Sequence, residues 1–164
     1  MPRGGTESIA EQPVIGWREW VRLPGLLDLP IKAKIDSGAR TSSIHSFGTR
    51  RFVEGGAPMV EFLLHPLQRR DTPATRCIAP IKDERWVRSS NGEREHRIVI
   101  ETEARLGEVR WPIELTLADR DVMGFRMLLG REAIRRRFLI DPARSFRLSR
   151  RNPKAVRTFE AANP

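Results

Sequence analysis

Short runs in which apolar and polar residues alternate dominate this chain, and that period of two is typical of β-strands that bury one face. Such runs cover residues 14–23 and 29–35. Residues 127–129 are continuously apolar, which predicts a short strand buried on both faces. The pattern therefore predicts a chain built mainly from strands.

Turn sequences join three pairs of these runs and predict β-hairpins. Residues 46–64 turn at Gly55-Gly56, residues 86–100 at Asn91-Gly92, and residues 98–117 at Leu106-Gly107. Asn-Gly is a strong signal, because both central residues of a tight hairpin turn need positive φ.

A single short helix is expected at residues 132–137, and residues 138–148 then predict a final strand. Many short strands, one short helix and frequent turns indicate a mainly β fold, a small closed β-barrel. We expect this barrel to occupy residues 14–149. A polar, disordered segment at 1–13 would precede it, and a basic, disordered tail at 150–164 would follow it.

The size and composition of the chain fit one folded domain. Its 164 residues are 39% hydrophobic and 31% charged, so it can bury a substantial core and remain soluble. No stretch is apolar for long enough to act as a signal peptide or to span a membrane. Cys77 is the only cysteine and cannot form an internal disulfide. We therefore expect a cytoplasmic protein that does not contact membranes.

The chain is strongly basic, with 30 Lys and Arg residues, 21 Asp and Glu residues and a formal net charge of +9. Residues 131–157 hold ten of the basic residues and two of the acidic ones. A field of this sign attracts polyanions such as nucleic acid or acidic peptides. The alternative is a solvated basic face, because charge alone is an unspecific signal.

The most informative motif is Asp36-Ser37-Gly38-Ala39, which follows the strand predicted at 29–35. A carboxylate at the end of a strand, followed by a hydroxyl and a glycine, suits an acid held on a tight turn that faces a partner. An ordinary β-turn uses the same residues, so the motif alone does not decide between the two.

A second motif, Leu128-Leu129-Gly130-Arg131, lies before the predicted helix. Together the two motifs resemble the retropepsin-like aspartic proteases, in which Asp-(Thr/Ser)-Gly is followed later in the chain by two apolar residues and Gly-Arg. Longer strings are similar to the branch labelled "ATP-dependent zinc protease" or RimK-associated protease. They are KAKIDSGARTSSIH, LLHPLQ, VRSS, WPIELTL, DRDVMGFRMLLGREAI and RFLIDPARSF, within residues 14–149.

The resemblance implies an aspartic endopeptidase with a closed acid-protease barrel. Such an enzyme needs two neighbouring carboxylates that share one proton. This chain has one Asp-Ser-Gly, so the resemblance implies a homodimer in which each subunit supplies one Asp36. The residues that would support the catalytic loop are Ser37, Gly38, Ala39, Leu129, Gly130 and Arg131.

Substrate contacts are expected from Arg40, four residues after the catalytic carboxylate, and from a mobile hairpin. Retropepsins close their site with a hairpin that lies between the two motifs, and residues 86–100 occupy that place here. The predicted flap residues are Arg88, Ser89, Ser90, Asn91 and Gly92. An ordinary solvent-exposed hairpin is the alternative.

We expect no cofactor and no metal. The three histidines, His45, His65 and His96, form no HExxH motif, although His45 and His65 with Cys77 and Asp36 remain a conceivable zinc set. No phosphate-binding GxxxxGK[ST] loop supports ATP use. The ATP in the branch label points to associated ATP-grasp ligases that add glutamates. That link suggests a polyglutamate-tailed peptide or protein as substrate.

Three functions therefore compete. The first is a homodimeric aspartic endopeptidase, with glutamate-rich peptides as candidate substrates. The second is a non-catalytic basic β-barrel that binds nucleic acid or an acidic protein. The third is a zinc hydrolase. The two matched motifs favour the first.

Overall fold

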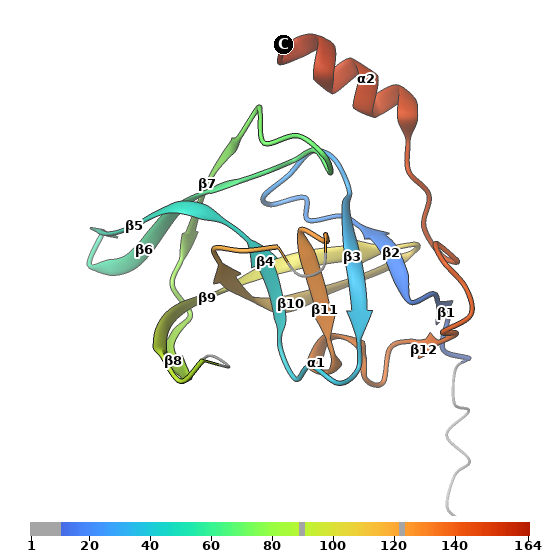
Figure 1. Ribbon diagram of the computed structural model, residues 1–164, viewed down its shortest axis with the longest axis horizontal. Coiled ribbons are helices and arrows are strands. Elements are labelled where there is room, and N and C mark those ends of the chain that lie inside the picture. Colours follow the sequence, from blue (N-terminus) through green and yellow to red (C-terminus); the bar gives the residue numbers. More distant parts are fainter. Residues whose placement is uncertain (1–10, 89–90, 122–123) are drawn as a thin grey trace, which may run out of the picture.

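The computed structural model describes residues 11–88, 91–121 and 124–164. Within them the chain is mainly β (Figure 1). The elements are β1 (Val14–Ile15), β2 (Arg18–Val21), β3 (Ile31–Asp36), β4 (Ser42–His45), β5 (Phe47–Glu54), β6 (Ala57–Leu64), β7 (Thr75–Pro80), β8 (Asp83–Arg88), β9 (Arg94–Leu106), β10 (Val109–Ala118), β11 (Met127–Gly130), α1 (Arg131–Ile134), β12 (Leu139–Ile140) and α2 (Pro153–Ala162).

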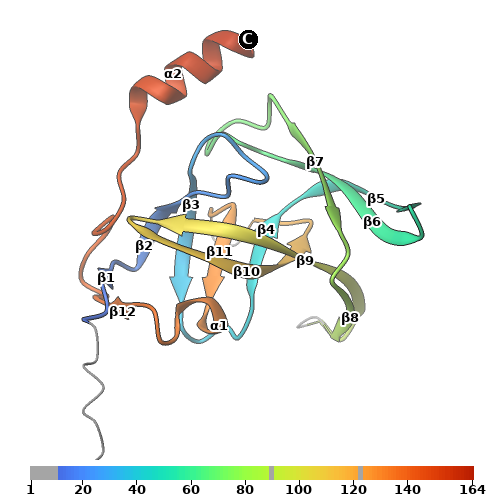
Figure 2. The ribbon, with the colours of Figure 1, turned by 180° about the vertical axis from the view of Figure 1, so that it is seen from behind.

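The main sheet has seven strands in the order β2-β3-β11-β4-β10-β9-β8. The inner strand β11, between β3 and β4, is buried at every position, which explains its continuous apolar sequence. The β9–β10 hairpin runs across β3, β11 and β4 in both views, so the sheet folds over itself (Figures 1 and 2). One core cluster fills the space between, and it includes Ile35, Ile100, Leu115 and Leu129.

The strands β5, β6 and β7 form a separate three-stranded sheet. Alternate residues of β6, Val60, Phe62 and Leu64, are fully buried and belong to the main core cluster. The register of β5 shifts between Phe47 and Arg50, next to Gly48 with its φ of 60°. This irregularity turns the chain away from the main sheet.

The mainly β fold and the three hairpins are confirmed. Gly55, Gly56, Gly92 and Gly107 all have positive φ, as the predicted turns require. The closed barrel is corrected: the described sheets are not closed by a continuous ladder. The physical reason is that β5–β7 pair among themselves, and an isolated bridge between Arg22 and Arg105 links the edge next to β2 to β9, the neighbour of the other edge strand β8.

The final strand expected at 138–148 is wrong, since only Leu139–Ile140 forms a strand there, paired with β1. The backbone N–H groups of residues 147–149 donate to a side chain instead of to a neighbouring strand. The Glu19 carboxylate, which is fully buried, accepts hydrogen bonds from the backbone N–H groups of Arg147, Leu148 and Ser149 at 2.8–3.0 Å. It also accepts from Gly16 N–H and the Ser149 hydroxyl at 2.8 and 2.7 Å.

The tail expected to be disordered carries the helix α2 instead. The side chain of Asn152 accepts a hydrogen bond from Ala155 N–H at 3.1 Å, and Pro153 opens the first turn. Val156 then packs on Leu29 and Leu67 in a small second cluster. A cap and an apolar contact therefore order a segment whose charge alone suggested disorder. No helix of the described residues is long and apolar enough to cross a membrane.

We predict that Glu19→Gln lowers the free energy of unfolding by about 3 kcal/mol, because an amide nitrogen would face N–H donors where a buried carboxylate oxygen now accepts. Urea denaturation followed by circular dichroism measures the change. Glu108→Gln, at an exposed position, is the matched control and should change stability by less than about 0.5 kcal/mol. Equal effects of the two substitutions would contradict this role of Glu19.

Candidate active site

The first motif forms a tight loop at the end of β3. Asp36 is half-buried, and its Oδ1 accepts hydrogen bonds from Gly38 N–H at 2.9 Å and Ala39 N–H at 3.2 Å. Two loop amides therefore fix one carboxylate oxygen, whereas Oδ2 accepts no hydrogen bond from another described residue. Ser37 and Gly38 are exposed beside it. The loop presents a carboxylate, a hydroxyl and a bare backbone to the solvent.

The second motif lies directly against this loop. β11 pairs in parallel with β3 so that Gly130 lies opposite Asp36 and Leu129 opposite Ile35. Arg131 N–H donates to Ala39 C=O at 2.7 Å, and the Arg131 guanidinium donates to Ser37 C=O at 3.1 Å. The two motifs, 90 or more residues apart in sequence, thus form one structural unit.

Glycine is required at position 130 because the backbones touch there. A Cβ atom at Gly130 would lie 2.5 Å from Thr41 C=O and 3.0 Å from Ala39 C=O. Gly130 N–H also donates to the buried Ser42 hydroxyl at 3.0 Å. Ser42 was missed by the sequence analysis. The signal for it was its place on the same face of β4 as the buried Ile44, two residues further along the chain.

Arg40 lines a hollow of about 490 Å³ beside the loop. Its side chain is 78% exposed and lies 3.9 Å from Glu132, a loose ion pair. The hollow brings the loop residues Arg40 and Ser42 together with Arg85 of β8 and Arg137 after α1. Arg85 and Arg137 are further residues that the sequence analysis did not single out.

The predicted flap is a real hairpin, but the described residues of its tip, Asn91 and Gly92, are not among those that line this hollow. β8 and β9 pair antiparallel from Asp83 with Val99 to Arg88 with Arg94. Asn91 accepts a hydrogen bond from Glu93 N–H at 3.3 Å, and Gly92 has a φ of 85°. Ser89 and Ser90 lie outside the described residues. A flap function of Arg88–Gly92 stays a prediction.

The side chains of the conceivable zinc set, His45, His65, Cys77 and Asp36, are not grouped around a common point. Among the described residues, no three His, Cys, Asp or Glu side chains are grouped so as to hold a metal ion. Cys77 is buried, its thiol points to Leu26 C=O at 3.5 Å, and burial raises its pKa to about 11. A thiol of this kind is a poor ligand and a poor nucleophile.

His45 and His65 instead join an ionic cluster around the buried Arg126 that the sequence analysis missed. Their rings lie 5.1 Å apart, and His45 Nδ1 is 2.9 Å from Asp121. Arg126, which is 6% exposed, lies 3.2 Å from both Asp121 and Asp71. Burial, and next the charge of Arg126, lower the pKa of His65, although the Asp71 carbonyl opposes the shift.

The shift at His65 makes stability depend on pH. The unfolded chain binds a proton at His65 more readily than the folded chain, so folding is favoured while His65 is neutral. We predict that the free energy of unfolding falls as pH drops below the ordinary histidine value of 6.5, and that His65→Gln flattens this slope. Urea denaturation of both proteins between pH 7.5 and about 5 tests it. Parallel curves would contradict the prediction.

The close approach at Gly130 yields a second prediction. Gly130→Ala forces the Thr41 and Ala39 carbonyls away and should cost about 3 kcal/mol or more of stability. Gly25→Ala is the matched control, because its added Cβ would come no closer than 3.4 Å to Thr102, at ordinary contact distance. Thermal and urea unfolding measure both, and a neutral Gly130→Ala would refute the packing argument.

Comparison with known proteins agrees with this geometry. Residues 14–151 match the RimB-like family, described as "Retropepsin-like aspartic endopeptidase RimB". A protein named "Probable alpha-L-glutamate ligase" from Shewanella halifaxensis is 49% identical over 143 residues, which are 87% of this chain and 31% of that protein. Its counterpart from Desulfotalea psychrophila is 46% identical over 138 residues, 84% of this chain and 30% of the relative.

The chain therefore spans just under a third of the length of these relatives. A crystal structure of a Legionella pneumophila protein of unknown function has the same fold, with a TM-score of 0.69 and 23% identity. The match covers 84% of this chain and 98% of that one. With the family matched over residues 14–151, the chain belongs to the RimB-like family of retropepsin-like aspartic endopeptidases.

Proposed function

We propose that this chain is a homodimeric aspartic endopeptidase that hydrolyses peptide bonds with water activated between two Asp36 carboxylates. The observation that carries the proposal is the Asp36 loop, locked by its own amides and by Arg131 yet open to the solvent. Membership of the RimB-like family supports the reaction class.

The dimer follows from the chemistry. Two carboxylates a few ångströms apart share one proton, since two like charges so close cannot both ionise. The ionised carboxylate takes a proton from water, and the protonated one polarises the scissile carbonyl. The chain has one Asp-Ser-Gly motif, so a second copy supplies the partner across a two-fold axis. The exposed Ser37 hydroxyl would then brace the partner's loop.

The substrate we propose is a peptide rich in glutamate. The hollow beside the loop is lined by three arginines, Arg40, Arg85 and Arg137. Its lining also includes two carboxylates, Glu114 and Glu132. Guanidinium groups bind carboxylates with paired hydrogen bonds. The printed name of the relatives, an alpha-L-glutamate ligase, fits the same chemistry and suggests a functional link to such a ligase. The β8–β9 hairpin would close over the bound peptide.

The test is cleavage of a mixed peptide library that includes oligoglutamate tails, read by mass spectrometry. Asp36→Asn should lower the rate by about 10³-fold or more, because a neutral amide cannot accept the proton from water. Asp28→Asn, an exposed position, is the matched control and should retain activity. Wild-type cleavage should survive EDTA.

Cleavage by Asp36→Asn at the wild-type rate would refute the aspartic mechanism. Loss of cleavage in EDTA would favour a metal hydrolase. If the wild type cleaves no peptide, the non-catalytic binding domain becomes the better reading. Mixing wild type with an excess of Asp36→Asn should also depress activity, because mixed dimers would hold one competent carboxylate.

A further inference from the structure

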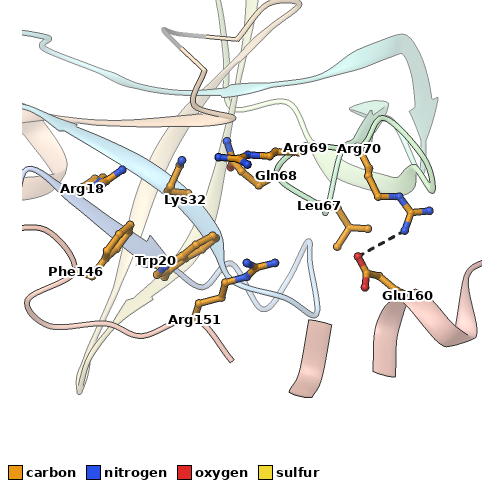
Figure 3. A pocket seen from close by; sticks show the side chains of 10 residues that line it. All are labelled: Arg18, Trp20, Lys32, Leu67, Gln68, Arg69, Arg70, Phe146, Arg151 and Glu160. Carbon is orange, nitrogen blue, oxygen red and sulfur yellow. Dashed lines mark ion pairs between the residues drawn. The ribbon is translucent and has the colours of Figure 1, made fainter. Parts of the chain in front are cut away.

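A second hollow, of about 390 Å³, lies toward the other end of β3 from Asp36, and Figure 3 shows the side chains that line it. It forms between β2, β3, the segment 67–70 and α2, near the opposite end of β3 from Asp36. Its lining residues are Arg18, Trp20, Lys32, Leu67, Gln68, Arg69, Arg70, Phe146, Arg151 and Glu160. The proposed protease chemistry uses none of them, although Lys32, Leu67, Gln68 and Phe146 fall within the strings that resemble the family.

The charge of this hollow is strongly unbalanced, with five cations and one carboxylate in its lining. Glu160 lies 3.6 Å from Arg70. Within residues 11–88, 91–121 and 124–164, the other four cations, Arg18, Lys32, Arg69 and Arg151, form no ion pair with an acidic side chain. Burial, and next the charges of Arg18 and Arg69, lower the pKa of Lys32. The cations therefore repel one another, and a bound anion would relieve that repulsion.

Two aromatic rings hold part of this cluster in place. Trp20 and Phe146 stack with centroids 5.8 Å apart and planes at 19°. The Arg18 guanidinium lies over Phe146 at 4.8 Å, and that of Arg151 over Trp20 at 5.9 Å. A stacked guanidinium keeps the N–H groups at its edge free for paired hydrogen bonds to an oxyanion. The rings thus orient the two arginines.

We propose that this hollow binds a compact ligand with two or more phosphoryl groups. Each phosphoryl group brings up to about two negative charges and three acceptor oxygens. A di- or triphosphate therefore matches five cations within 390 Å³. A glutamate side chain brings one charge, and a hollow of this size accommodates only one or two of them.

This binding site is separate from the proposed catalytic centre. Lys32 and Asp36 lie on one face of β3, four residues and roughly 13 Å apart at the usual rise of a strand. The Asp36→Asn variant should therefore bind the phosphate ligand as the wild type does. Failure of the protease proposal would leave this one standing, and the reverse also holds.

The experiment is calorimetric titration of the full chain with tripolyphosphate, hexaglutamate and a dodecamer of deoxythymidine at one ionic strength. We expect tripolyphosphate to bind one per chain and more tightly than hexaglutamate. Arg69→Gln and Arg151→Gln should each weaken it by about tenfold or more. Glu160→Gln should strengthen it severalfold, a gain that misfolding cannot produce. Arg137→Gln, an exposed cation in the other hollow, should change it less than about twofold.

Three results would overturn the proposal. One is no binding of tripolyphosphate at millimolar concentration. Another is equal weakening by Arg137→Gln and Arg69→Gln, which would mean unspecific attraction to net charge. The third is stronger binding of hexaglutamate or of the oligonucleotide that Arg69→Gln and Arg151→Gln weaken and Arg137→Gln does not, which would assign the hollow to an acidic peptide or to nucleic acid.

Discussion

The buried carboxylate of Glu19 holds together parts of the chain that are distant in sequence. It accepts hydrogen bonds from Gly16, at the start of the fold, and from three successive amides between Arg147 and Ser149. These bonds fix the C-terminal segment against β2, and with it Phe146 and Arg151. The hollow that Arg18 and Arg151 line, and the segment that leads to α2, therefore depend on one acidic side chain that is not part of the hollow's lining.

The Asp36 loop is built on a different principle, the close approach of two backbones. β11 lies between β3 and β4, and Gly130 lets Arg131 reach the Ala39 and Ser37 carbonyls. Arg131, through its backbone N–H and its guanidinium, and the Asp36 carboxylate, through the two loop amides, together hold the Asp36 loop. A substitution that removes either side chain would therefore loosen the loop.

The sequence predicted these local features well, because turn chemistry and apolar runs are local. The Asn91-Gly92 hairpin and the buried strand around Leu129 were both anticipated. The contact between the two motifs joins distant segments and was expected from the family resemblance, not from a local signal. The errors concern contacts between distant segments. No sequence pattern around residue 147 indicates that its backbone N–H group donates to Glu19. The high charge of residues 150–164 suggested disorder, although Asn152 caps the helix α2 there. The cluster around Arg126 also joins distant residues and has no sequence signature.

The single Asp36 loop per chain has a consequence in terms of concentration. In a homodimer of this design, a subunit alone is chemically incomplete, so the amount of competent enzyme follows the square of the subunit concentration when dimers are scarce. Dilution would then act as an off switch, and local accumulation of the chain as an on switch. A cell could regulate such an enzyme by its abundance and location without any modification of the protein.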